Sequence, residues 1–298
     1  MTNAYILSQV ANGIILGSMY ALIAIGFSMI YGIVRLINFA HGDIFTIGAF
    51  ATLASIAVLN VPFPVAIVIV VATGAAFGML IERVAFRPMR GAPQVTGFIA
   101  SLAVSIILEN LAVLTVTAQP RSFQVPQILN RLVVMGGLSV RMIDLMIVVL
   151  AIVLMIALVL FVRFTKVGVA MRATAENYDV ARLMGINIDR MILLAFAIGS
   201  GLAATAGLMW GSKYGQVSPF MGILPGLKAF VAAVIGGVGS ISGAVLGGYV
   251  LGLAEVLFVG LLPPEYSGYR NAFVFGALIL VLLVMPNGLL GRSTETRA

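Results

Sequence analysis

The sequence predicts an all-α membrane protein in which one bundle of transmembrane helices occupies the whole of residues 1–298. Hydrophobic residues make up 61% of the chain and charged residues only 9%, whereas soluble domains contain about 45–50% and about 25% respectively. The mean hydropathy is +1.15. In addition, residues 1–34, 44–81 and 229–254 carry no charged side chain, and about 20 apolar residues are enough to cross a bilayer.

The apolar segments, taken in order, give the expected crossings. The second segment is only 16 residues long, roughly 24 Å of helix, whereas the hydrocarbon core is about 30 Å thick. We therefore expect at least one discontinuous helix, which begins inside the membrane and not at its surface. The predicted segments are 13–34, 44–59, 65–81, 95–117, 145–162, 191–211, 221–262 and 271–285.

The distribution of Lys and Arg predicts the sides of the membrane. Loops 82–90, 163–190 and 292–298 contain three, five and two of the 17 basic residues, and an excess of basic residues marks cytoplasmic loops. If all three are cytoplasmic, residues 221–262 must form two crossings bent at 236–240. The count is then nine crossings with the amino terminus outside, although eight crossings remain possible.

Several other functions are excluded by what the sequence lacks. Cysteine is absent and His41 is the only histidine, so we expect no disulfide, no metal site and no cofactor. There is no G-x-x-x-x-G-K-[ST] loop to bind ATP, and no set of residues typical of a nucleophile and its base. The net charge of +7 belongs to short loops between crossings and does not indicate a nucleic-acid partner. Because Arg35 is the first charge, we expect no cleavable signal peptide.

Small residues form a stripe near the expected bend. Gly239, Gly243 and Gly247 recur at every fourth position, and in lipid such spacing allows helix backbones to approach closely. The stripe is consistent either with packing inside the bundle or with a dimer or heterodimer face. The motif alone does not decide between them.

Loop 163–190 contains a short, well-delimited helix. Thr174 is the expected N-cap, and Glu176 and Asp179 would place negative charge near the positive end of the helix. Gly185 is expected just past its end, and Asn187 is expected to cap the next helix. A helix this short is not stable alone. It therefore rests either on lipid or on a protein partner, and its mixed charges favour the partner.

A second group of polar residues interrupts the apolar pattern between the first two segments. Asn38, His41 and Asp43 lie here, and Gly42 would permit a break in the backbone. One interpretation is an ordinary solvated turn at the cytoplasmic surface. The other is an interrupted helix that lines a translocation path, as in transporters. Farther along the chain, Glu109 is expected to pair with Arg121 at the membrane surface.

Loop 163–190 also resembles a known motif. Residues 172–190 resemble the loop of ABC-importer permeases that docks into the ATPase, with Glu176, Ala181 and Gly185 at matching positions. Asn177 stands where the general motif has alanine, so the resemblance is to the branched-chain amino-acid subclass, and specifically to its LivH-type permease subunits. Three further blocks carry the same resemblance, at residues 38–49, 234–244 and 282–291.

This resemblance implies a permease subunit of a binding-protein-dependent importer in the bacterial inner membrane. A LivM-type second permease, two cytoplasmic ABC ATPase subunits and an extracytoplasmic amino-acid-binding protein would be its partners, with lipid around the bundle. Thr174, Glu176, Asn177, Ala181 and Gly185 would couple it to the ATPase. The resemblance also favours a path lined by the group at residues 38–43. The alternative is a self-sufficient, ion-coupled transporter or channel for small polar solutes. Amides, urea or other amino acids remain possible cargoes.

Overall fold

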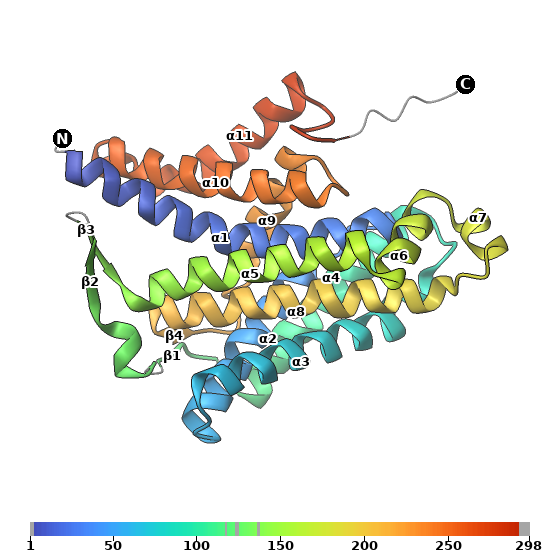
Figure 1. Ribbon diagram of the computed structural model, residues 1–298, viewed down its shortest axis with the longest axis horizontal. Coiled ribbons are helices and arrows are strands. Elements are labelled where there is room, and N and C mark those ends of the chain that lie inside the picture. The colour runs from blue at the N-terminus through green and yellow to red at the C-terminus, as the bar shows by residue number, and fades with distance from the viewer. Residues whose placement is uncertain (1–2, 117, 123–124, 136–137, 292–298) are drawn as a thin grey trace.

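The computed structural model describes residues 3–116, 118–122, 125–135 and 138–291 (Figure 1). Within these ranges, eight helical segments are long and apolar enough to cross a membrane, which confirms the predicted bundle. They are α1 (Asn3–Val34), α2 (His41–Leu53, extended by a π-helical turn at Ala54–Val58), α3 (Phe63–Ile81), α4 (Gln94–Thr115), α5 (Met142–Phe164), α8 (Ile188–Tyr214), α10 (Ile241–Leu261) and α11 (Arg270–Val284, preceded by a 3-10 turn at Pro264–Tyr269).

Shorter elements connect the long helices. Two antiparallel strand pairs lie between them, β2 with β3 and β1 with β4. The shorter elements are the helices α6 (Lys166–Glu176), α7 (Tyr178–Leu183) and α9 (Ile223–Gly236), a π-helical turn at Glu82–Phe86, 3-10 turns at Arg87–Met89 and Gln127–Asn130, and the strands β1 (Arg121–Ser122), β2 (Leu132–Met135), β3 (Leu138–Arg141) and β4 (Gln216–Val217).

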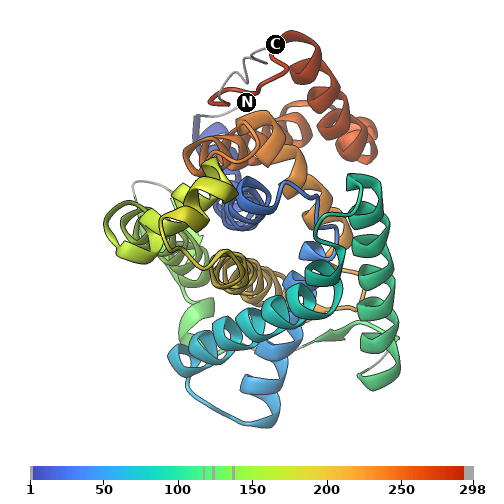
Figure 2. The same cartoon turned by 90° about the vertical axis from the view of Figure 1, so that its right-hand side faces the viewer.

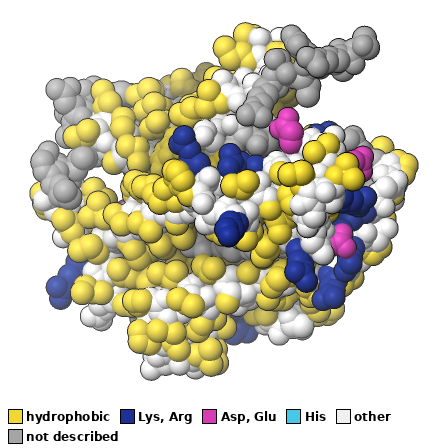
Figure 3. All heavy atoms as spheres, turned by 45° about the vertical axis from the view of Figure 1, so that its right-hand side comes forward, with side chains coloured by type: hydrophobic (Ala, Val, Ile, Leu, Met, Phe, Trp, Pro, Cys, Tyr) yellow, Lys and Arg dark blue, Asp and Glu magenta, His cyan; other side chains and the backbone are white. Residues whose placement is uncertain are grey.

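The bundle has two distinct ends, which lie at opposite ends of its long axis (Figure 1). The hairpin end carries both strand pairs. The α7 end carries α6, α7, the turns at residues 82–89 and the bend between α9 and α10. In the space-filling view (Figure 3), hydrophobic side chains cover most of the visible face, and charged side chains gather mainly on the side of the α7 end. This distribution fits a protein whose middle is surrounded by lipid.

Helices α1 and α8 form the centre of the bundle, and other helices surround them when the molecule is viewed from the α7 end (Figure 2). In the most apolar window of α1, 94% of the residues are buried, against 11% for α4. The segment Pro264–Val284 is still less buried, at 6%. These two outer segments therefore expose apolar side chains along most of their length.

Helix α1 begins earlier than the sequence predicted. We expected the first crossing to start at Gly13 because polar residues precede it, but the helix already begins at Asn3. The helix thus extends past the predicted crossing at the hairpin end. There the hydroxyl of Tyr5 donates a hydrogen bond to the carbonyl oxygen of Gly260 at 2.7 Å.

At its other end, α1 stops at Val34 because Arg35 adopts a left-handed backbone with φ of 56°. The chain then turns back into the bundle. Nε2 of His41, the first residue of α2, lies 3.3 Å from the carbonyl oxygen of Ile23. Ile23 is roughly 16 Å of helix below the end of α1, so α2 begins well inside the bundle, as its short apolar segment predicted.

Helix α9 begins at the same depth as α2. A Cβ atom added to Gly42 would lie 2.7 Å from the carbonyl oxygen of Gly222, and one added to Gly226 would lie 2.7 Å from the Cα of Gly42. Glycine is required here because the two helix starts touch backbone to backbone. With 14 residues, α9 spans roughly 21 Å and does not cross the core by helix alone. With α9, the described chain has nine apolar helical segments, eight of which are long enough to cross a membrane.

Residues 221–262 form two helices with the expected bend, since Gly237 and Gly239 have φ values of 107° and 83°. The glycine stripe lies at contacts within this chain. A Cβ atom on Gly243 would lie 2.2 Å from the carbonyl oxygen of Gly236, and one on Gly247 would lie 1.9 Å from that of Ala232. A Cβ atom on Gly239 would reach the Cα of Gly32 in α1 at 3.5 Å.

Candidate functional site

Loop 163–190 is built from two helices, and not from the single helix that we predicted. Thr165 caps α6 by accepting a hydrogen bond from the backbone N–H of Gly168 at 3.0 Å. Helix α6 then continues to Glu176, and Thr174 is buried inside it, with its hydroxyl bonded to the carbonyl oxygen of Ala170 at 2.8 Å. The prediction that Thr174 is an N-cap was therefore wrong. A threonine that bonds back to residue i−4 is accommodated within a helix, and nothing in residues 166–176 breaks one.

Asn177 is the N-cap of α7. Its side-chain oxygen accepts hydrogen bonds from the backbone N–H groups of Asp179 at 2.9 Å and Val180 at 3.1 Å. Glu176 consequently ends α6 and does not begin the exposed helix, which corrects its expected place. Asp179 lies in the first turn of α7, as predicted.

The other expected caps are confirmed. Gly185 has φ of +79°, the left-handed conformation predicted just past the end of the helix, and its N–H bonds to the carbonyl oxygen of Arg182 at 2.9 Å. Asn187 caps α8 by accepting from the N–H of Arg190 at 3.0 Å.

Helix α7 presents apolar side chains outward. Ala181 is buried, but Leu183 is 87% exposed and Met184 is 77% exposed. Two large apolar side chains beside each other at the tip of the molecule are costly to leave in water. The tip of α7 thus exposes an apolar surface at this end of the molecule.

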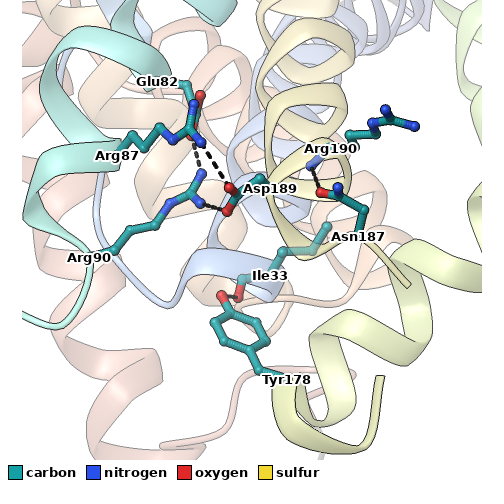
Figure 4. Close-up of polar contacts among 8 residues, drawn as sticks. All are labelled: Ile33, Glu82, Arg87, Arg90, Tyr178, Asn187, Asp189 and Arg190. Atoms are coloured by element: carbon teal, nitrogen blue, oxygen red, sulfur yellow. Dashed lines mark hydrogen bonds and ion pairs between the residues drawn. The ribbon is translucent and has the colours of Figure 1, made fainter. Parts of the chain in front are cut away.

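Tyr178 attaches α7 to the bundle. Its hydroxyl donates a hydrogen bond to the carbonyl oxygen of Ile33 at the end of α1 (Figure 4). Burial raises the pKa of the Tyr178 hydroxyl, against a smaller lowering by Arg90 and Arg35. The hydroxyl therefore stays protonated, and remains a donor, throughout the neutral range.

Beside this contact, four charged side chains join the loop after α3 to the start of α8 (Figure 4). Arg87 Nη2 lies 2.9 Å from Asp189 Oδ2, and Arg90 forms ion pairs with both Asp189 and Glu82. Glu82 is only 2% exposed, because the π-helical turn that it begins directs it inward. We did not predict this cluster, although the run of charges at 82–90 directly after an apolar segment was a signal for it.

A cavity of about 320 Å³ lies where α2 and α9 begin. Asn38, His41, Gly42 and Asp43 all line it, so the structure brings the four predicted path residues together and places them inside the bundle. The rest of its wall is mostly apolar and comes from α1, the segment before α2, α4, and α9 with the residue before it: Phe27, Phe39, Phe98, Leu102, Ser105, Ile106, Glu109, Gly222, Ile223, Gly226, Leu227 and Phe230.

Several polar atoms that line this cavity lack protein partners, although Asp43 is hydrogen-bonded to Ser105 and His41 contacts Ile23. Asn38 and His41 are each 2% exposed and Asp43 is 4% exposed. Even so, both amide atoms of Asn38, Nδ1 of His41 and Oδ2 of Asp43 make no hydrogen bond within the described chain. Buried polar atoms are nearly always paired, so these unpaired atoms are available to bind water or a ligand in the cavity.

Glu109 does not lie where we expected it. No salt bridge joins it to Arg121 in the part of the chain that the structure describes. Instead it lines the cavity at the start of α2, and together with Asp43 it also lines a second cavity of about 300 Å³ farther along α2 and α4. The sequence offered no signal for this position beyond a lone carboxylate in an apolar helix.

A second buried polar cluster joins α9 to α10. Lys228 Nζ lies 2.7 Å from Glu255 Oε1, and the hydroxyl of Tyr20 donates to Glu255 Oε2 at 3.0 Å. Nε of Arg270 lies 3.1 Å from Glu255 Oε1. We did not predict this pairing from the sequence. The signal for pairing was that each residue is the one charge of its helix, and lone charges in membranes tend to pair.

Within the described residues, no group of three or more His, Cys, Asp or Glu side chains could hold a metal ion. Short helices that begin at mid-depth beside a polar cavity, inside a bundle of membrane-crossing helices, are the architecture of a membrane transporter.

The particular family follows from comparison with known proteins. The family model for the permease component of branched-chain amino acid transport systems matches residues 9–283, and the chain therefore belongs to that family. It is a multi-pass protein of the bacterial inner membrane, and its relatives are permease subunits and not enzymes. No solved structure matches the chain.

Individual relatives match over nearly the full length. The high-affinity branched-chain amino acid transport system permease protein LivH of Escherichia coli (strain K12) is 42% identical, over 97% of this chain and 96% of its own length. BraD of Pseudomonas aeruginosa, described in the same words, is 40% identical over 96% of each chain. The xylose transport system permease protein XylH of Escherichia coli (strain K12) matches less, at 34% identity over 43% of this chain and 34% of its own length.

Proposed function

We propose that this chain is the membrane-spanning permease subunit of an ATP-driven importer, which receives branched-chain amino acids from an extracytoplasmic binding protein. In this proposal the α7 end is cytoplasmic and faces two ABC ATPase subunits. A LivM-type permease lies beside this chain and completes the membrane part. The descriptions of relatives at 42% and 40% identity support the substrate class.

The structure of α7 is the main support for the proposed coupling to the ATPase. It is held at its start by the Asn177 cap and at its end by Gly185, and Ala181 seats it against the bundle. Its exposed apolar tip needs a cover, and Tyr178 ties it to α1. We assign ATPase docking to loop 174–185, with Glu176 at the junction and Thr174 stabilising α6 from inside.

The cavity at the start of α2 and α9 is the proposed translocation path. Asn38, His41, Gly42 and Asp43 line it, and the two interrupted helices meet there. Contacts within this chain occupy the stripe of Gly239, Gly243 and Gly247. We therefore assign contact with the second permease to the exposed faces of α4 and α11, and not to that stripe.

The proposal is tested with the complete transporter in membrane vesicles. We expect ATP-dependent uptake of leucine, isoleucine and valine, and we expect the ATPase subunits to copurify with this chain. Gly185→Val and Glu176→Lys should insert normally, because neither changes a crossing, yet both should lose bound ATPase and uptake together. The valine is strained at positive φ, and the lysine reverses a charge beside α7.

Two variants serve as controls. Gly185→Asn should retain function, since asparagine tolerates the left-handed conformation. Gly91→Val introduces the same strain at φ of +89°, also with nothing within 4 Å, but in a different loop of the same end. If Gly185→Val and Glu176→Lys both keep the ATPase and normal uptake, the docking assignment is wrong. If this chain alone performs uphill, ion-driven uptake, it is instead a secondary transporter.

A further inference from the structure

The cavity at the start of α2 and α9 has polar features that a simple translocation path does not need. A pore through which a solute only diffuses needs no unpaired polar atoms, and burying such atoms costs free energy. This cavity has four of them on Asn38, His41 and Asp43, and each of these side chains is at least nine-tenths buried. These unpaired atoms are therefore candidates to bind the polar groups of a ligand.

The unpaired atoms are mainly hydrogen-bond acceptors. Nε2 of His41 faces the carbonyl oxygen of Ile23, which can only accept, so Nε2 carries the proton. In the neutral ring, Nδ1 is then an acceptor. Oδ2 of Asp43 is a second acceptor, and the Glu109 carboxylate lies on the same cavity wall. An ammonium group, with three N–H donors and a positive charge, satisfies such a set.

One unpaired donor lies among the residues that carry these acceptors. Asn38 leaves both its amide N–H₂ and its amide oxygen without partners, so it can donate to a carboxylate while its oxygen receives an ammonium hydrogen. A simple cation would leave this donor unused. The polar edge therefore matches both charged groups of an α-amino acid.

The remaining wall matches an aliphatic side chain. Phe39 contacts Phe98 and Phe230 with ring centroids 5.1 and 6.2 Å apart, and Phe230 contacts Phe27 at 5.3 Å. These four rings form a continuous apolar surface beside the polar edge. The volume of about 320 Å³ falls at the small end of ligand-binding pockets.

We propose that this cavity is a binding site for a zwitterionic aliphatic amino acid in transit. Asp43 and His41 receive its ammonium group, Asn38 donates to its carboxylate, and the phenylalanine cluster holds its side chain. The proposal rests on the proposed function, since it assigns a membrane site to the substrate of that importer. It places part of the selectivity within the membrane, in addition to any selectivity of the binding protein.

The chain contains no cysteine, so a single introduced cysteine can report on the cavity. We would place one at Leu102 or, if that variant does not fold, at Ile106, both on the cavity wall. Ser267→Cys, on an exposed turn, is the matched control. The complete transporter in membranes is labelled with N-ethylmaleimide, with leucine as the probe.

Leucine at ten times its dissociation constant should slow labelling in the cavity by roughly tenfold, and should not slow labelling at Ser267→Cys. The analogue 4-methylpentanoate, which lacks the ammonium group, should not protect. In an Asp43→Asn background, the leucine concentration needed for protection should rise by about 10- to 100-fold. Asp43→Glu should recover part of that loss.

Three results would overturn the proposal: no protection by leucine, equal protection in Asp43→Asn, or full protection by sodium or 3-methylbutylamine, which lack the carboxylate. Uptake measured in the same membranes separates a failure of the cavity assignment from a failure of the proposed function. If ATP-dependent uptake of leucine is intact but leucine does not protect, only the cavity assignment fails. If the cysteine-free parent takes up no branched-chain amino acid, the proposed function fails.

Discussion

Helix α9 lies between two buried polar groups that differ in how well they are satisfied. On the α10 side, Glu255 receives Lys228 at 2.7 Å, Tyr20 at 3.0 Å and Arg270 at 3.1 Å. On the α2 side, Asn38 and Asp43 present atoms with no partner in the described chain. Both groups are buried to a similar degree, with Glu255 and Asn38 each 2% exposed.

The two groups differ in role: one holds helices in place, and the other is available to bind a ligand. A buried charge whose hydrogen bonds are all made within the protein fixes the position of the helices that carry it. Buried atoms left unpaired do not stabilise the fold, and in the proposal above they bind the polar groups of the ligand. Substitutions should therefore affect stability in the first group and transport in the second.

The largest effect is expected from Glu255→Leu. This change would leave Lys228 buried without its partner, and breaking a buried pair in this way costs about 3–5 kcal/mol. We expect low yield from membranes and a lower melting temperature in detergent. The double variant Lys228→Met with Glu255→Leu should recover much of the loss. A single variant as stable as the parent would show that the pair does not hold α9.

Gly243→Leu tests the same pair of helices at their bend. A Cβ atom there would meet the backbone oxygen of Gly236 at 2.2 Å, and overpacking of this kind costs about 1–3 kcal/mol or more. We expect reduced yield and a reduced melting temperature. Gly276→Leu is the control, because nothing lies within 4 Å of a Cβ at that position of α11. Equal effects of the two variants would contradict close packing of α9 on α10.

Asp43→Asn should reduce transport and leave the stability of the protein nearly unchanged. Its Oδ2 has no partner to lose, so the melting temperature without substrate should stay near that of the parent. Leucine uptake at low concentration should nevertheless fall by about 10- to 100-fold, because a charge-assisted bond to the ammonium group is lost. A variant that is unstable but fully active would reverse the comparison between the two groups.

The smallest effect is expected from Tyr178→Phe, which removes the bond between α7 and α1. One hydrogen bond contributes about 0.5–1.5 kcal/mol, so substrate-stimulated ATP hydrolysis should fall by roughly 2- to 10-fold with normal insertion. Burial raises the pKa of this hydroxyl, and the bond needs the protonated form, which is lost only as the pH rises past that pKa. The ratio of variant to parent should therefore be constant between roughly pH 6 and 9. A ratio that changes within this range would contradict the assigned contact.

The sequence predicted local features better than tertiary ones. The glycine bend after α9, the left-handed Gly185 and the Asn187 cap each follow from the chemistry of a few neighbouring residues. The prediction that Thr174 is an N-cap was wrong because Thr165 and Asn177 can fill the same role. Only the packed structure shows which side chain reaches a free N–H group.

Pairing between helices was beyond local reasoning. Lys228 and Glu255 are 27 residues apart, and their contact depends on how α9 folds back on α10. The path residues at 38–43 were predicted as a group, but their missing partners became visible only in the packed structure. Glu109 was assigned to a surface pair for the same reason: its helix was known, and the face it presents was not.

Helix α1 provides a stiff link between α7 and the cavity. Tyr178 is bonded to its backbone at Ile33, and His41 contacts its backbone at Ile23, roughly 15 Å of uninterrupted helix away. A helix is stiff along its axis because every turn is braced by hydrogen bonds to the next. A displacement of α7 by an ångström or two would therefore arrive at the cavity wall almost undiminished, while the irregular segment 35–40 that runs beside α1 could bend without transmitting force.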